Sequence, residues 1–225
     1  MLYSFECKTN TFFVAVELLD SFLKETDESL EANTIHILGI VSMLIASKIE
    51  EVSPFSVSMV AEKISHGKIL KEDLVNWEIK FTEILGFRLL RNPNLFVFTE
   101  LILVKMNYHT FDFWNEIANS TRYVTTMALF DYLLLQSYSL EYLGCGCVYL
   151  AFKILEQTRD DLQVHQYIDE MMDNFNLNER IFFAVSESLL CLAKKFDNSF
   201  KFAKNLRHYV AFTPEETSDY LSNAL

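Results

Sequence analysis

Apolar residues recur along this chain at the three- and four-residue spacing of helices. One stripe consists of Val14, Leu18, Leu19, Phe22 and Leu23, and a second of Leu74, Trp77, Phe81, Ile84 and Leu85. Such spacing places each set on one face of a helix. The 225 residues include five Gly and three Pro, too few for the tight turns of a sandwich or barrel. The pattern predicts an all-α protein.

The same pattern predicts where the helices lie. Expected helices cover about 11–24, 30–51, a short stretch ending near residue 65, 71–87, 95–107, 112–135, 139–157, 162–173 and 177–197, before a short helix and a polar tail. The helix over 30–51 is apolar around most of its circumference, so we expect it at the centre of a core. Ser53 and Pro54 are expected to be the N-cap and first-turn proline of the short helix.

An internal echo predicts two tandem domains. Leu38-Gly39, Ala46 and Lys48-Ile49 recur as Leu143-Gly144, Ala151 and Lys153-Ile154, at a constant offset (143 − 38 = 105). A second echo relates residues 18–23 to residues 129–134. The offset is far longer than a solenoid repeat, which favours two domains over an array. We expect domains over 1–91 and 92–198, joined near Pro93, and a C-terminal helix and polar tail over 199–225.

Charge and composition narrow the class of protein. The formal net charge of −12 makes binding to a phosphate backbone unfavourable, so no nucleic-acid partner is expected. No run of about 18 apolar residues suggests a membrane span, and the first residues do not resemble a signal peptide. Cys145 and Cys147 are too close in sequence for a usual metal clip and are expected to be buried, reduced thiols. These features predict a protein of the nucleus and cytoplasm.

Motifs for catalysis are absent from the sequence. There is no glycine-rich phosphate loop, GxSxG or HExxH, and the five histidines are scattered. We therefore expect no catalytic residues, no metal and no cofactor. A helical enzyme whose residues converge only in space stays an alternative that no residue cluster supports. The chain is expected to act through its surface.

The end of the apolar central helix has an unusual charge pattern. The helix finishes with Lys48, Glu50 and Glu51, and Pro54 stops it. Two glutamates at a helix C-terminus oppose the negative end of the helix dipole. Either a group outside the helix binds these charges, or the end is simply solvated, and the residues alone leave both open.

Residues 38–54, Leu-Gly-Ile-Val-Ser-Met-Leu-Ile-Ala-Ser-Lys-Ile-Glu-Glu-Val-Ser-Pro, resemble the signature of the first cyclin box. The resemblance continues through Asn76-Trp77-Glu78-Ile79 and Ile84-Leu85-Gly86-Phe87 and covers about residues 11–197. It is closest to cell-cycle cyclins and implies two tandem five-helix cyclin-box domains. About ten residues precede the first helix, so the opening helix of the first box is expected to be missing, in a minimal cyclin or a truncated chain. The usual substrate docking patch is then doubtful, and a groove is left for another element.

The resemblance implies a regulatory subunit that binds and activates a cyclin-dependent protein kinase, as a heterodimer, in cell-cycle control. The family's contact lysine and glutamate map to Lys48 and Glu78 (78 − 48 = 30). Its apolar contacts map to Ile45, Ile49, Phe87 and Leu89, and its acidic flank to Glu50 and Glu51. A purely internal Lys48–Glu78 salt bridge is compatible with this interpretation. A transcription-type cyclin that pairs with a polymerase-tail kinase, and a cyclin-fold adaptor without a kinase, remain alternatives.

The C-terminal tail contains a short motif around Thr213, Pro214 and Thr217. An apolar residue followed by Thr-Pro and a later Thr resembles a phosphorylation-dependent degradation signal, in which phosphate would add charge and acceptors. A plain acidic tail is the alternative reading.

Overall fold

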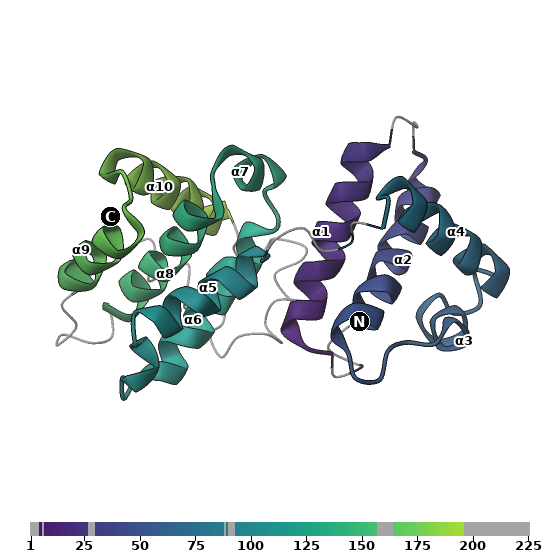
Figure 1. The fold of residues 1–225 in the computed structure, drawn as a ribbon, viewed down its shortest axis with the longest axis horizontal. Helices are drawn as coiled ribbons and strands as arrows, with labels where there is room; N and C mark the ends of the chain where they lie inside the picture. The colour runs from purple at the N-terminus through teal and green to yellow at the C-terminus, as the bar shows by residue number, and fades with distance from the viewer. Residues whose placement is uncertain are drawn as a thin grey trace. The chain divides into compact units, whose positions relative to one another are not determined.

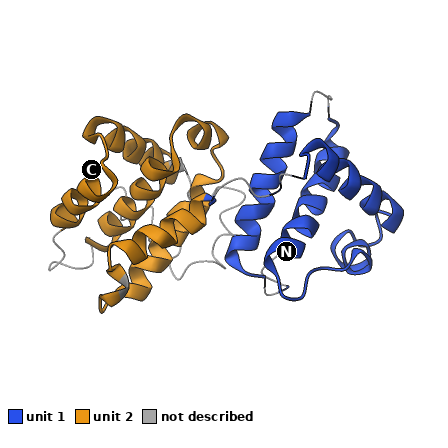
Figure 2. Ribbon diagram, in the orientation of Figure 1, with its two compact units in different colours: residues 1–94 blue, residues 95–225 orange. Residues whose placement is uncertain are grey.

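The structure, a computed structural model, describes Phe5, residues 7–26, 30–87, Leu89, 93–156 and 164–195. All regular elements in these residues are helices, which confirms the all-α prediction. The chain forms two compact units, Met1–Asn94 and Leu95–Leu225 (Figure 2). The sequence analysis places the division after residue 91, and the structure places it after Asn94.

The first unit is built around its second helix (Figure 1). Its elements are α1 (Thr9–Glu25), α2 (Ala32–Glu50), α3 (Val57–Met59), η2 (Val60–Ile64) and α4 (Lys71–Ile84). Helix α2 packs against both α1 and α4, and Val41 and Leu44 on it are completely buried. The rings of Phe22 and Phe81 stack with their centroids 4.6 Å apart and join α1 to α4. The predicted central position of the apolar helix is confirmed.

Helix α2 is also long and apolar enough, by length and composition alone, to cross a membrane. In this structure most of its apolar residues pack inside the protein. Six of them and two serines are buried in the core, namely Leu38, Ile40, Val41, Ser42, Leu44, Ile45, Ala46 and Ser47. The core of the first unit therefore accounts for its apolar character.

The short helix after α2 begins later than predicted. Ser56, not Ser53, is its N-cap, and the Ser56 side chain accepts a hydrogen bond from the backbone of Met59. Pro54 lies in the preceding loop, which is fixed where the Phe55 backbone N–H donates to the Ser47 hydroxyl over 3.2 Å. The helix then continues as the π-helix η2, a form that periodicity in the sequence does not reveal.

The second unit has more elements. They are α5 (Leu95–Lys105), η3 (Tyr108–Thr110), α6 (Trp114–Ala128), α7 (Tyr132–Ser137), α8 (Leu140–Glu156), α9 (Val164–Phe175) and α10 (Glu179–Lys195). The helix predicted over 112–135 is interrupted because Asp131 caps α7, accepting a hydrogen bond from the backbone of Leu134 at 3.0 Å. Helix α8 is central and packs against α5, α6, α9 and α10. It corresponds to α2 at the offset of 105 residues.

Small residues on α8 allow its neighbours to approach closely. A Cβ atom built on Gly144 would lie 2.8 Å from Ile102 Cδ1 and 2.9 Å from Phe98 Cδ1, both on α5. A Cβ atom on Gly146 would lie 3.0 Å from Leu189 Cδ1 on α10. The two glycines therefore allow two different helices, α5 and α10, to pack closely against α8.

The cysteines of α8 are expected to resist alkylation. Cys145 and Cys147 are fully buried, and burial raises the pKa of both thiols to about 12, whereas Cys191 is exposed. Because the thiolate is the reactive form, a maleimide should modify Cys191 in the native chain and reach the α8 thiols only after unfolding. Peptide mass mapping checks this prediction, and rapid labelling of Cys147 in the folded chain contradicts the packing described for α8.

Candidate functional site

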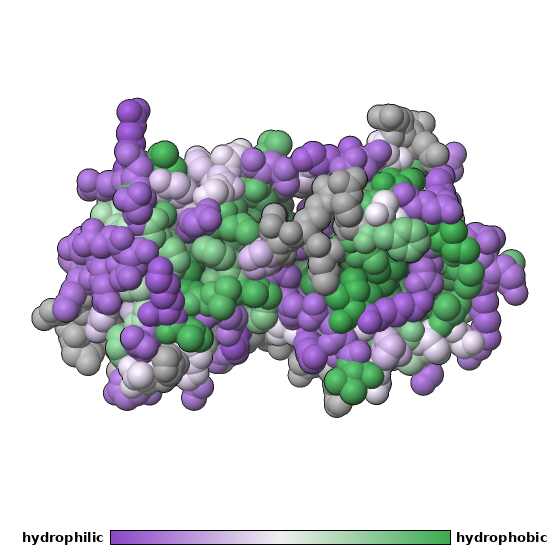
Figure 3. All heavy atoms as spheres, in the orientation of Figure 1, coloured by the Kyte–Doolittle hydropathy of each residue, from purple (hydrophilic) through white to green (hydrophobic). Residues whose placement is uncertain are grey.

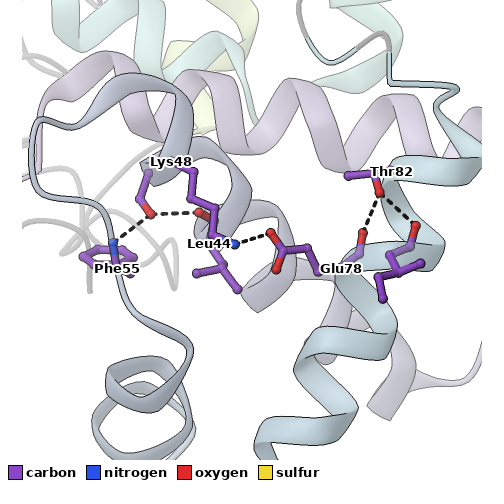
Figure 4. A network of polar contacts seen from close by, with 7 residues as sticks. Leu44, Lys48, Phe55, Glu78 and Thr82 are labelled. Carbon is purple, nitrogen blue, oxygen red and sulfur yellow. Dashed lines mark hydrogen bonds and ion pairs between the residues drawn. The ribbon is translucent and has the colours of Figure 1, made fainter.

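An ion pair joins the end of α2 to the middle of α4 (Figure 4). Lys48 Nζ lies 2.5 Å from Glu78 Oε1, and both side chains reach solvent. The resemblance to cyclins selected both residues as kinase contacts and left an internal salt bridge between them as a compatible interpretation, and the structure forms that salt bridge. An ammonium group has three N–H donors, so this contact leaves the lysine able to donate to a further acceptor.

The packing of the two helices fixes the position of this ion pair, and the ion pair contributes little to the stability of the helices. On α4, the Thr82 hydroxyl donates to the backbone oxygens of Glu78 and Ile79, at 3.0 Å and 2.9 Å, and fixes the local turn (Figure 4). Partly exposed ion pairs contribute only about 0–1 kcal/mol to stability, because solvent screens them. Substituting the pair should therefore leave the fold intact, and the pair is suited to a role at the surface.

The predicted apolar residues differ in accessibility. Ile45 is 3% exposed and belongs to the first core, so direct contact of its side chain with a partner would require α2 to move. Ile49 and Leu89 are half-buried and pack against the same core. Phe87 is 75% exposed. Of the four, Phe87 presents the largest apolar surface to solvent.

Phe87 also has a strained backbone. Helix α4 ends in a turn in which Gly86 and Phe87 both have positive φ, 55° and 57°. The Phe87 N–H donates to the oxygen of Thr82 over 3.0 Å, which closes the turn. A bulky residue is rare in this left-handed region, and strained residues cluster at functional sites. An exposed phenylalanine held in a strained turn is therefore a strong candidate contact residue.

Two further exposed apolar residues flank Glu78 on α4. Val75 and Ile79 are one turn apart and both exposed, while Leu74 and Phe81 on the same helix are fully buried. Sequence reasoning did not select them. The available signal was an apolar pair at i, i+4 that lies outside the buried stripe of α4.

The acidic residues at the end of α2 have an internal partner. The Glu51 carboxylate accepts hydrogen bonds from the Lys8 backbone N–H, at 2.8 Å, and from the Thr11 hydroxyl. Lys8 is the N-cap residue of α1, so Glu51 places negative charge at the positive end of that helix. The side chain of Lys8 donates to the backbone oxygen of Glu50 over 2.7 Å. The start of α1 thus binds the charge of Glu51, and contact of Glu50 and Glu51 with another protein stays a prediction.

Glu51→Ala is expected to destabilise the first unit. The change removes the acceptor for two donors at the start of α1, and loss of a helix cap costs about 0.5–2 kcal/mol. Glu50→Ala is the matched control, because the bond to Lys8 uses a backbone oxygen that alanine keeps. Urea unfolding of the two variants measures the difference. Equal stability of Glu51→Ala and Glu50→Ala contradicts the capping role.

Two further predictions concern the tail motif and metal binding. Thr213, Pro214 and Thr217 lie outside the described residues. Within the described part of the chain, no three His, Cys, Asp or Glu side chains gather as metal ligands would.

Known proteins that are similar to this chain include a protein family, a solved structure and a viral relative. Residues 1–90 match the family model "Cyclin, N-terminal domain". The crystal structure of a viral cyclin from herpesvirus saimiri superposes with a TM-score of 0.54 and 19% identity, covering 100% of this chain and 80% of that one. A protein of Acanthamoeba polyphaga mimivirus named "Putative serine/threonine-protein kinase" is 25% identical over 221 residues, which is 97% of this chain. The chain spans 37% of the length of that relative.

Proposed function

We propose that this chain is a regulatory subunit that binds and activates a serine/threonine protein kinase, because residues 1–90 match the model of the cyclin N-terminal domain and the chain has the fold of a viral cyclin. The observation that carries the proposal is the Lys48–Glu78 pair across α2 and α4. Glu78 lies on α4, which also exposes Val75 and Ile79, and Phe87 follows that helix. Aromatic residues such as Phe87 are enriched in the cores of protein interfaces.

The mimivirus relative supports a connection with a kinase. Its name describes a serine/threonine kinase, and this chain matches 37% of it. The chain itself has five glycines and no glycine-rich phosphate loop. We infer that the kinase activity named for the relative belongs to the part that this chain does not match.

The proposed mechanism is a shift of a kinase equilibrium. An active kinase needs a glutamate on its C-helix paired with the lysine that holds the ATP phosphates. A subunit that binds only the state with this pair formed makes that state dominant. Moving the equilibrium from 1:99 to 99:1 requires about ten-thousand-fold tighter binding to the active state. Signalling assemblies commonly bury roughly 2,000 Å² or more, and we expect an interface of that size here.

The finer proposal is that the partner is a cyclin-dependent kinase, that the pair controls the cell cycle, and that it acts in the nucleus and cytoplasm. The likeness of residues 38–54 to cell-cycle cyclins supports this choice over a transcription-type cyclin. Kinase activity that rises and falls through a synchronised culture favours the cell-cycle role. Constant activity directed at polymerase tails favours the alternative.

Affinity capture of the tagged full chain from its own cells tests the proposal. We expect a serine/threonine kinase to be retained and to phosphorylate a generic protein substrate. Capture of partners without any kinase activity contradicts the proposal and leaves an adaptor of the same fold.

A further inference from the structure

One face of α8 is completely covered in the second unit. Helix α5 lies over Gly144, and the side chains of Phe98 and Ile102, one turn apart, come closest to this glycine. One turn further along α8, Val148 is fully buried. The α5–α8 contact is part of a separate cluster that also includes Ile117 and Phe152.

The corresponding face of α2 is open. Gly39 corresponds to Gly144 at the offset of 105, and a Cβ atom built on it would have nothing within 4 Å. Met43 corresponds to Val148 and is only partly buried. Among the described residues of the first unit, no helix takes the place that α5 takes in the second. In the first unit, therefore, the surface of α2 around Gly39 has no described helix packed over it, whereas α5 covers the equivalent surface of α8.

The neighbouring helix α1, which packs against α2, carries a second row of apolar residues. Phe12, Val16, Leu19 and Leu23 follow each other at i, i+4, i+7 and i+11 on one face of α1, beside the stripe that enters the core. Leu23 is 39% exposed, and the other three are half-buried. On α2, Ile35 is 44% exposed and lies one turn before Gly39. We call these residues, with Gly39 and Met43, the open strip. Figure 3 shows hydrophobic side chains gathered in the region of α1 and α2.

A carboxylate borders the open strip. Asp20 is four residues after Val16 and three before Leu23, so it is their neighbour on the helix surface. Burial raises the pKa of Asp20 above its ordinary value. A partly desolvated carboxylate of this kind is stabilised by an ammonium or guanidinium group.

We propose that the open strip binds an amphipathic helix of another protein, which places two bulky apolar side chains, four residues apart, over Gly39 and a lysine or arginine beside Asp20. This helix does for the first unit what α5 does for the second. The mode is helix-in-groove recognition, in which apolar anchors on one helix face enter a hydrophobic groove. The surface is distinct from the Lys48–Glu78 pair, so the inference does not depend on the proposed function.

A peptide that copies α5 is the probe. The fluorescein-labelled peptide carries residues 95–105 with Leu101→Lys and Val104→Lys, because both positions are exposed on α5 and lysines there supply solubility and positive charge. Its matched control adds Phe98→Asp and Ile102→Asp, which removes the apolar anchors. Fluorescence anisotropy measures binding to the full chain, and circular dichroism verifies the fold of each protein variant.

We expect saturable binding that weakens at least tenfold with Gly39→Leu, which fills the open surface at this position, and severalfold with Asp20→Asn. Leu70→Ala, which removes an exposed apolar residue elsewhere on the first unit, should leave the affinity unchanged. Absence of saturable binding, or equal affinity for the control peptide or for Gly39→Leu, overturns the proposal. Binding that emerges only after removal of residues 196–225 also overturns it, because the chain's own end then occupies the strip.

Discussion

Replacing Lys48 and Glu78 together by alanine is expected to lower the kinase-activating ability of this chain at least a hundredfold while its helical content stays the same. The pair is partly exposed and contributes at most about 1 kcal/mol to the fold. Truncating charged groups that become buried in an interface costs about 2–5 kcal/mol in binding, largely because their partners lose hydrogen bonds. Two such losses account for the expected hundredfold fall in kinase-activating ability. The measurement is stimulation of the captured kinase by each purified variant, with circular dichroism alongside.

The chain supplies its own matched control. Lys153 corresponds to Lys48 at the offset of 105, and its ammonium contacts Glu156 on the same helix at 2.7 Å. This pair does not join two helices, so Lys153→Ala with Glu156→Ala removes the same charges without touching the α2–α4 surface. Full activation by the control and none by the Lys48/Glu78 variant is the expected contrast. Equal activation by the two double variants contradicts the assigned surface.

Gly144→Leu is expected to destabilise the second unit strongly. Even a Cβ atom at this position would lie 2.8 Å from Ile102 Cδ1 and 2.9 Å from Phe98 Cδ1, so a leucine has to displace these two side chains of α5 or shift the helix itself. Overpacking of a core costs about 1–3 kcal/mol, occasionally more, and we place this case near 3 kcal/mol. For a chain of this size, that loss lowers Tm by roughly 6–12 °C.

Gly39→Leu is the matched control for this second prediction. The equivalent position on α2 has nothing within 4 Å of a built Cβ atom, so the larger side chain meets no obstacle. Replacing a helical glycine also removes a propensity cost of about 1 kcal/mol. Thermal unfolding should therefore show a large drop for Gly144→Leu and none for Gly39→Leu. An equal fall in Tm for the two variants contradicts the difference in packing around Gly39 and Gly144.

Much of the fold followed from periodicity. The apolar helix over 30–51 and its echo at an offset of 105 predicted two central helices, and α2 and α8 have those positions. Periodicity carries this information since one buried stripe orients the whole helix. The resemblance to cyclins, not periodicity, singled out Lys48 and Glu78, and the contact between them was a compatible interpretation that the structure now shows.

Other features depend on contacts between distant residues, and the sequence did not reveal them. The partner of Glu51 is the start of α1, 43 residues earlier, and nothing local to Glu51 indicates it. The echo of residues 18–23 in residues 129–134 does not relate equivalent positions, since Asp20 lies inside α1 and Asp131 caps α7. The positive φ of Phe87 is likewise set by how α4 ends, and a phenylalanine does not predict it.

The most direct test of the central claim is the rate of phosphate transfer by the captured kinase after this chain has been stripped from it and then added back. If the chain is an activating subunit, removal lowers the rate at least tenfold, and the purified wild-type chain restores it while the Lys48/Glu78 double variant does not. A rate that is unchanged by removal and return of the chain contradicts the account.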